Sequence, residues 1–522
     1  MEKIKRYTNK ISYENLMPFY CRNDRKSFIC GLYTTISLLF LILFGVGCTK
    51  DDITVQNING TDILSFYLED GSAKCCAFSI RDSQIYVMVP NQCNLVSMRT
   101  RCVHNGIKAK IDGTELNERV ISDYSDFSKP HVVTIESSEG VKKNYSVCLF
   151  DLPVVLIDTK DKVSIVDKET WIPATMKIID TSGKNMFETD MLIKGRGNGS
   201  WKSEHYKKKS YSIKLDKKRE ILGYPKSKRW VLLGTSADKT KMRTPLCFKL
   251  SEWSGFNWSP KGANVEFVLN GKLMCNYFLC EQIRVEKNRI NIQEMTPSDT
   301  IGESLTGGAL LEVSTERDEK YQFLSQKTWL TFMFKCPNDS IHNKQFSYFT
   351  AFIDTVETIL SSNSRIEKNE YERYVDIDSY IRWWLIHELC LNLEEVSPWK
   401  NLYMYKDRGY DSKLYAGPPW DFDWGTFWEE NVEKWLGKDR LWFANLFYNP
   451  HFCTRVKDIW KNLKEKCDKS IDDFVKNIAD MNKKSVLRDQ SYYPIEFPEE
   501  ISNVDNGMEY DESINYLLNV LK

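Results

Sequence analysis

Short runs in which polar and apolar residues alternate dominate the chain from residue 53 to residue 152. Gly, Asn, Asp and Pro separate five such runs, at residues 63–68, 84–89, 108–111, 131–135 and 144–149. Alternation places every second side chain on one face of a sheet, and turn residues at about ten-residue spacing are typical of β-sandwiches. The pattern predicts an all-β domain over residues 49–152.

Strands continue after residue 153, but they now alternate with glycine-rich turns and a helix. Further strand patterns lie at residues 154–158, 174–180, 206–215, 230–234, 265–269 and 277–283. Asn270-Gly271 between two of them is a typical hairpin turn. Residues 237–253 carry apolar side chains at helical spacing, and Thr244-Pro245 suits the start of that helix. The segment therefore mixes strands with a helix.

The last third of the chain is mainly helical. Residues 377–393 are apolar at helical spacing, and Asp376 or Asp378 can cap them. Two short strands follow, at residues 402–405 and 413–416, and residues 514–521 form a last amphipathic helix. The whole chain is therefore expected to be α+β, with the mixed part over residues 153–522.

Composition narrows the functional classes. The 522 residues contain 72 basic and 72 acidic side chains, which argues against a nucleic-acid partner held by bulk charge. Six histidines without HExxH spacing and fifteen cysteines without a CxxC motif argue against zinc. Disulfides among Cys75, Cys76, Cys93, Cys102 and Cys148 stay open if the chain is exported.

The N-terminus predicts export. Basic residues precede an apolar run over residues 28–46, which ends in Gly45-Val-Gly-Cys48. This is the layout of a signal peptide over residues 1–48, with one transmembrane anchor as the alternative. The Gly-Cys step resembles a lipobox with a lipid on Cys48, and residues 49–52 (TKDD) resemble the export signal of Bacteroidetes surface lipoproteins. The expected location is the outer membrane, exposed at the cell surface, with the β domain resembling the Ig-like modules that follow such anchors.

Residues 416–425 (AGPPWDFDWG) are the strongest candidate for chemistry. Asp421 and Asp423 alternate with aromatic residues after a short strand, so their carboxylates can share one face. Two hard oxygen ligands on one face suit Mg²⁺. The alternative is a solvated turn, because such Asp pairs are frequent in turns.

The order of residues around this stretch favours the first interpretation. Glu394, Asn401 and Asp421 follow one another as the catalytic-loop acid, the Asn and the metal-binding Asp of protein kinases do. Upstream, a glycine-rich turn carries Arg196, and Arg can grip phosphate with two hydrogen bonds. The alternative is an ordinary glycine-rich hairpin turn, which is the commoner case. The lysines of the strand at residues 206–215 either face solvent, which is usual for a run of charges, or one of them points to phosphates. Positions 209 and 214 are an odd number of residues apart, so at most one of these lysines can face such a site.

Eight motifs in this order resemble the spore-coat protein H (CotH) kinase family. They lie at residues 194–201 (KGRGNGSW), 208–215 (KKSYSIKL), 238–243 (DKTKMR), 279–283 (LCEQI), 307–312 (GGALLE), 392–394 (NLE), 400–405 (KNLYMY) and 419–423 (PWDFD). The resemblance implies an atypical, two-lobed protein-kinase-like domain over residues 153–522. It also implies ATP-dependent phosphorylation of hydroxyl groups on a protein substrate, with Mg²⁺.

The resemblance assigns roles by motif. Asp421, helped by Asp423 or Asn401, matches the Mg²⁺-binding position. The remaining matches concern nucleotide contact, and they are Arg196, Lys209 and Glu281.

One departure bears on catalysis. Spore-coat members carry Asp where this chain has Glu394, which is one methylene longer, and Glu395 is a rival shifted by one. Catalysis depends on fine placement of the acid, so the longer side chain is expected to reduce or abolish activity. Three hypotheses follow: an exported kinase, a non-catalytic binding or scaffold lipoprotein on the same fold, and an unrelated Mg²⁺ hydrolase or carbohydrate-acting enzyme.

Overall fold

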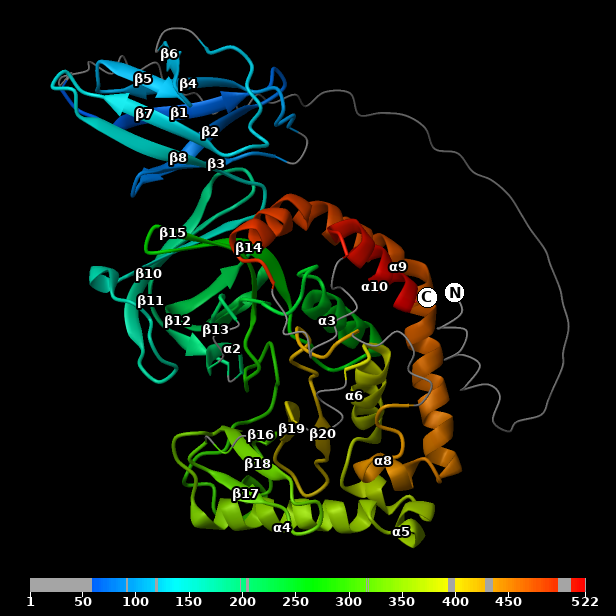
Figure 1. The fold of residues 1–522 in the computed structure, drawn as a ribbon. Coiled ribbons are helices and arrows are strands. Elements are labelled where there is room, and N and C mark those ends of the chain that lie inside the picture. The colour runs from blue at the N-terminus through cyan, green and yellow to red at the C-terminus, as the bar shows by residue number, and fades with distance from the viewer. Residues whose placement is uncertain are drawn as a thin grey trace, which may run out of the picture.

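The computed structural model describes residues 59–90, 93–117, 121–197, 199–202, 206–315, 317, 319–392, 400–427, 435–495 and 508–521. It is a mixed α/β structure in which two sheets and a closed barrel follow one another along the chain (Figure 1). The predicted signal peptide with Cys48, and Glu394 with Glu395, lie outside the described residues. Among the described residues, no helix combines the length and the apolar character needed to cross a membrane.

The N-terminal sheet has eight strands in the order β4-β1-β2-β3-β8-β7-β5-β6. Their bounds are β1 Ile63–Glu69, β2 Lys74–Arg81, β3 Gln84–Met88, β4 Arg99–His104, β5 Lys108–Ile111, β6 Thr114–Leu116, β7 His131–Glu136 and β8 Lys142–Phe150. All five strand patterns of the sequence fall on these elements. Alternate side chains such as Phe66, Val133 and Ile135 form the core. The Ig-like character of this sheet stays a prediction.

A seven-stranded closed barrel follows, in the order β10-β11-β12-β13-β15-β14-β9. Its strands are β9 Val154–Thr159, β10 Ile172–Ile179, β11 Asn185–Arg196, β12 Ser210–Ile221, β13 Tyr224–Leu233, β14 Gly262–Leu269 and β15 Lys272–Glu281. The 3-10 turn η1 (Lys160–Lys162) follows β9, and the short helix α2 (Gly199–Lys202) follows β11. Asn270 and Gly271 both have positive φ, as the predicted hairpin turn requires.

The N-terminal sheet packs directly on one end of the barrel. Tyr86, Met88 and Phe150 from the sheet share a buried apolar cluster with Val154 and Val268 from the barrel. The Tyr86 hydroxyl also donates to the backbone oxygen of the hairpin glycine at 3.1 Å. The two units therefore share a small core of their own.

Helix α3 (Arg243–Ser254) crosses beside the barrel. Thr244-Pro245, the predicted start, lies within one residue of the observed start, whereas residues 237–242 of the predicted helical span lie before the helix. The Asp238 carboxylate accepts hydrogen bonds from the backbone N–H groups of Thr240 (2.9 Å) and Arg243 (2.8 Å), which forms a turn before the helix. Of the predicted apolar stripe, Met242, Leu246 and Leu250 are fully buried, and its last member, Trp253, packs against the same core while partly buried.

The C-terminal part combines a five-stranded sheet, in the order β17-β18-β16-β19-β20, with helices. The strands are β16 Ala309–Ser314, β17 Gln322–Leu324, β18 Thr331–Cys336, β19 Leu402–Lys406 and β20 Leu414–Ala416. The helices are α4 Asn343–Leu360, α5 Asn363–Glu367, α6 Ile377–Leu389, α8 Leu441–Leu446, α9 Pro450–Tyr492 and α10 Tyr510–Leu521, with 3-10 turns η2 Gly302–Leu305 and η3 Glu370–Arg373. The Asp376 side chain caps α6 by accepting from the Ser379 N–H, as predicted.

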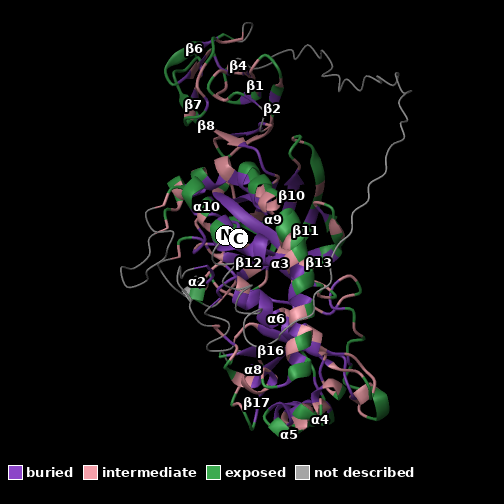
Figure 2. Cartoon of the chain, turned by 90° about the vertical axis from the view of Figure 1, so that its right-hand side faces the viewer, coloured by how far each residue is buried: buried purple, intermediate pink, exposed green. Residues whose placement is uncertain are grey.

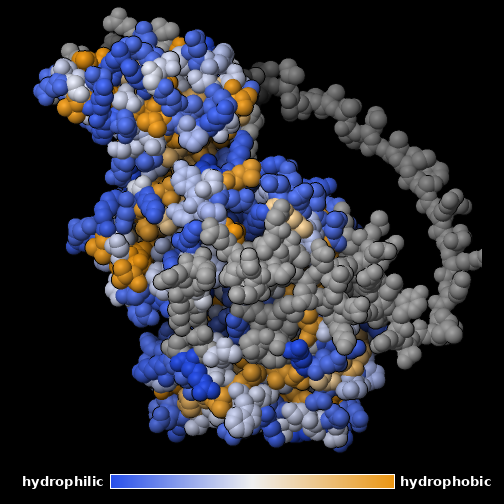
Figure 3. All heavy atoms as spheres, in the orientation of Figure 1, coloured by the Kyte–Doolittle hydropathy of each residue, from blue (hydrophilic) through white to orange (hydrophobic). Residues whose placement is uncertain are grey.

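Helix α9 spans 43 residues and packs against α3, α6, α10 and the barrel strand β15. Near its C-terminal end, Asp489 pairs with the buried lysines Lys208 and Lys241, and Arg488 pairs with Glu266 of β14. Figure 2 shows burial concentrated where α3, α6 and α9 meet. Polar side chains cover much of the N-terminal sheet on the face drawn in Figure 3.

Candidate functional site

Asp421 and Asn401 meet at one end of the β19–β20 hairpin. The two strands are antiparallel, so the start of β19 and the end of β20 lie at the same edge. Asn401 immediately precedes β19, and its side-chain amide donates to Asp421 Oδ2 at 2.9 Å. Both residues have positive φ, 56° and 68°. A non-glycine backbone in this region is strained, and such strain persists where the surroundings fix it, often at functional sites.

Asn392 holds the backbone of Asp421 through a hydrogen bond. It lies just beyond α6, is fully buried, and donates from its side-chain amide to the Asp421 backbone oxygen at 3.2 Å. Its own backbone N–H donates to the His387 oxygen at 2.9 Å, which fixes it to the end of the helix. The sequence pointed to this residue only as part of a motif and gave it no role.

Arg196 reaches the same place from the barrel. It is the last residue of β11, and its guanidinium lies 4.7 Å from the centre of the Trp420 ring. Such stacking orients the guanidinium beside the segment that carries Asp421. The structure therefore brings together three of the predicted residues: Arg196, Asn401 and Asp421.

Burial and neighbouring groups act in opposite directions on the pKa of Asp421. Burial raises the pKa of Asp421 above the ordinary value, while Arg196, Lys400 and the Asn401 hydrogen bond act in the opposite direction. Lys400 was quoted in a motif but not singled out as a site residue. A partly buried carboxylate with incomplete compensation is a place where a bound cation is favourable.

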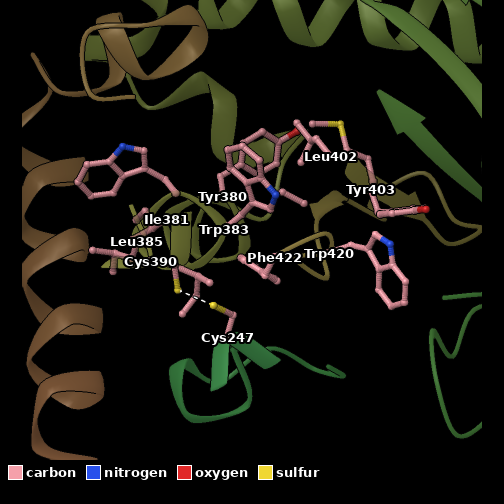
Figure 4. Packing of buried hydrophobic residues seen from close by; sticks show 14 of the residues in the cluster. Cys247, Tyr380, Ile381, Trp383, Leu385, Cys390, Leu402, Tyr403, Trp420 and Phe422 are labelled. Atoms are coloured by element: carbon pink, nitrogen blue, oxygen red, sulfur yellow. Dashed lines mark hydrogen bonds between the residues drawn. The ribbon is translucent and has the colours of Figure 1, made fainter. Parts of the chain in front are cut away.

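An aromatic column fixes the segment on both sides of Asp421. Phe422 is fully buried, with its ring centre 5.3 Å from the His387 ring and 6.2 Å from Phe248 of α3. Trp420 also packs on Phe248, at 5.4 Å, and Phe248 in turn contacts Phe278 of β15 at 6.1 Å. Figure 4 shows Phe422 and Trp420 leaving the same segment on different sides, with Phe422 directed toward the cluster that contains Cys247 and Cys390. The column prevents Asp421 from turning away.

Three other predicted residues have different surroundings. Lys209 precedes β12, and its Nζ donates to the Trp201 backbone oxygen of α2 at 2.9 Å, so it braces the glycine-rich turn. Glu281 is buried at the end of β15, with Arg289 Nε 3.5 Å from its Oε1, and burial raises the pKa of Glu281. Asp423 is partly exposed, two residues beyond Asp421. The ligand roles of these residues stay predictions.

A second charged cluster lies next to the site. Lys335 of β18 contacts Glu312 at 3.0 Å and Glu319 at 2.6 Å. Tyr403 of β19 pairs with Glu312 across the sheet, and its pKa is raised by burial and by the charge of Glu312, with a further contribution from Asp421. The buried Tyr403 thus lies within electrostatic reach of both the Glu312–Lys335 pair and Asp421.

The donor set fits a hard divalent cation completed by a ligand. Asp421 and Asn401 offer a carboxylate and an amide oxygen, which are donors that Mg²⁺ takes together with phosphate oxygens and water, and Asp423 stays a predicted third donor. Among the described residues, no group of three His, Cys, Asp or Glu side chains could hold a metal by itself.

A comparison with protein-family models now places the chain. The model described as CotH kinase protein matches residues 193–522, well over half of the sequence. The chain belongs to this family. The match begins on β11 just before Arg196 and takes in every candidate residue, so the predicted resemblance to CotH kinases is confirmed. A search of curated proteins finds no match to the chain.

Family membership gives the site a general meaning. CotH kinase proteins are kinase-like, so activity of the atypical-kinase type is indicated for the segment that carries Asp421. The hypothesis of an unrelated hydrolase gains nothing from this match. The N-terminal sheet lies outside the matched residues.

Proposed function

We propose that this protein is an ATP- and Mg²⁺-dependent atypical kinase that phosphorylates Ser or Thr hydroxyls of exported proteins. The Asn401–Asp421 pair carries the proposal, because its 2.9 Å hydrogen bond lies within the family match and beside the Arg196 guanidinium. A kinase needs an amide and a carboxylate that bind the metal, here Asn401 and Asp421, and a cation that binds the phosphates, here Arg196.

The residues divide the work as follows. Asp421, Asn401 and Asp423 would hold Mg²⁺, which neutralises charge on the β- and γ-phosphates when bound. Arg196 neutralises phosphate oxygens from the barrel side, and Lys209 contributes charge while bracing the α2 turn. Glu281 stabilises the barrel edge near the nucleotide. Glu394 orients the substrate hydroxyl and accepts its proton as the oxygen attacks the γ-phosphorus and ADP leaves.

The decisive experiment measures phosphate transfer from radiolabelled ATP by the purified chain with Mg²⁺. Asp421→Asn keeps the shape but removes the charge, so we expect incorporation to fall at least about 100-fold. Asp411→Asn is the matched control, since Asp411 is exposed in the β19–β20 turn, and should leave the rate unchanged. Full activity in Asp421→Asn would exclude the proposed site.

A second candidate is a non-catalytic binding or scaffold lipoprotein built on the same fold. The observation that favours it is the presence of Glu394 where spore-coat members of the family carry Asp. Glu394→Asp separates the two candidates. Transfer by the natural chain supports the kinase, whereas transfer by Glu394→Asp alone identifies a dormant site whose natural role is binding.

The location of the protein completes the proposal. A lipid on Cys48 anchors the chain in the outer membrane, with the rest exposed at the cell surface, where it meets its protein substrate. The supporting observation is the apolar run that ends in Gly-Cys, followed by an acidic pair. Labelling cells with an alkyne fatty acid tests it: the natural chain should take up label and Cys48→Ala should not. Equal labelling of both would contradict the anchor.

A further inference from the structure

Two cysteines from distant parts of the chain face one another in the main core. Cys247 lies in α3 and Cys390 directly follows α6, 143 residues later. Their sulfur atoms are 3.0 Å apart, and Figure 4 shows them pointing at one another. This distance exceeds the length of a disulfide bond, about 2.05 Å, by only about 1 Å, which small side-chain rotations can supply.

The surroundings of the two sulfurs are apolar. Both side chains are fully buried and belong to the same hydrophobic cluster as Leu246, Ile386 and Phe422. Burial raises the pKa of the Cys247 thiol well above its ordinary value. The thiolate needed for exchange is therefore suppressed once the core has closed, which places any reaction before or during its closure.

We propose that Cys247 and Cys390 form a disulfide bond as the protein folds in an oxidising compartment. The oxidant is a protein or small-molecule disulfide. One thiolate attacks a sulfur of that oxidant and forms a mixed disulfide, and the second thiolate then displaces the oxidant as a thiolate. Two thiols lose two electrons and two protons, and the oxidant's disulfide becomes two thiols.

The bond would fasten the floor of the site. Cys390 lies two residues before Asn392, whose amide supports the Asp421 backbone, and the Cys390 oxygen accepts from the Phe427 N–H at 2.9 Å. A covalent link from α3 to this point joins the helix under the aromatic column to both segments that carry the site. It also closes a loop of about 143 residues, the kind of loop for which the chain-entropy model gives a large stabilisation.

Peptide mapping of the exported natural chain tests the bond directly. After denaturation without reductant and alkylation of exposed thiols, we expect one cross-linked peptide pair that carries Cys247 and Cys390, lighter by two hydrogen atoms than the reduced pair. Recovery of both cysteines as alkylated thiols would overturn the proposal. So would a cross-link of Cys390 to Cys467, a partly exposed cysteine of α9 whose pKa is affected by Cys390.

Stability gives a second readout that does not depend on mapping. Reduction should lower the thermal midpoint of the natural chain by roughly 5 °C or more, and Cys247→Ala should abolish this difference. Cys453→Ala is the matched control, because Cys453 is a partly buried thiol of α9 outside the proposed pair. This variant should show the same fall in thermal midpoint on reduction as the natural chain. Cys75 and Cys93, with sulfurs 3.9 Å apart in the N-terminal sheet, give separate peptides and do not confuse the map. An unchanged midpoint on reduction of the natural chain would refute the bond.

Discussion

Acidification should destabilise the core beneath the candidate site through one side chain, His387. The imidazole is fully buried in α6, with the Trp383 ring centre 4.3 Å away and the Phe422 ring centre 5.3 Å away. Neither ring nitrogen has a hydrogen-bond partner among the described residues. Burial lowers the pKa of His387 to about 3, so the ring is neutral in the folded protein at ordinary pH.

The sign and size of the effect follow from linkage. The folded pKa lies below the ordinary value of 6.5, so between pH 6.5 and pH 3 the unfolded chain binds a proton that the folded chain does not. Stability is therefore lost as the pH falls through this window, by about 1.4 kcal/mol for each pH unit. Between pH 7 and pH 5 the loss from His387 alone is about 2 kcal/mol.

Urea unfolding followed by tryptophan fluorescence measures this loss. We compare the free energy of unfolding at pH 7 and pH 5 in the natural chain and in His387→Phe, which keeps a ring in the column but cannot take up a proton. The variant should lose about 2 kcal/mol less than the natural chain, because all other titrating groups are common to both. Equal losses in the natural chain and His387→Phe would refute the reasoning.

Three further changes test other parts of the structure. Asp489→Asn removes the negative charge that pairs with the buried Lys208 and Lys241, and should lower the free energy of unfolding in urea by about 3–5 kcal/mol. A loss under about 1 kcal/mol would contradict a stabilising role for these ion pairs. Asn392→Leu should lower phosphate transfer about tenfold, with unfolding changed by at most about 2 kcal/mol, since one hydrogen bond to Asp421 is lost; unchanged transfer would remove its positioning role. Gly307→Ala places a Cβ 1.9 Å from the Asp407 oxygen, so its thermal midpoint should fall by at least about 5 °C, whereas Gly199→Ala, which has open space around it, should not change it.

The strands were predictable because their signals are local. Residues 108–111 alternate polar and apolar side chains and form β5 with the same bounds, and Asn270-Gly271 makes the turn between β14 and β15. Period-two alternation and a turn that needs positive φ are both written in a few consecutive residues. Pairing order is not local, so the closure of seven strands into a barrel did not follow from the pattern.

The starts of two helices, α3 and α9, are set by side chains that accept hydrogen bonds from backbone N–H groups. The start of α3 is set by Asp238, which captures the Arg243 N–H five residues later and so delays the helix. The start of α9 carried a readable signal that was missed, since the Asn449 side chain accepts from the N–H groups of His451 and Phe452, with Pro450 in the first position.

The candidate site was predictable in its order but not in its supports. Asn401 and Asp421 flank a short hairpin, so antiparallel pairing alone brings them together. The contact of Arg196 with Trp420 joins the barrel to the C-terminal sheet, and no spacing rule fixes such a contact. The burial of Glu281 against Arg289 likewise depends on how strand ends meet other segments.

Helix α9 limits how the molecule can move. At about 1.5 Å per residue its 43 residues form a beam roughly 65 Å long. One part of α9 packs on α6 beneath the site. Near its C-terminal end, Arg488 and Asp489 form ion pairs with Glu266 and Lys208 of the barrel region. Rotation of the barrel against α6 would have to flex this beam or withdraw two buried ion pairs. Helix α9 therefore ties the barrel, which carries Arg196, to α6, which lies beside the segment that carries Asp421.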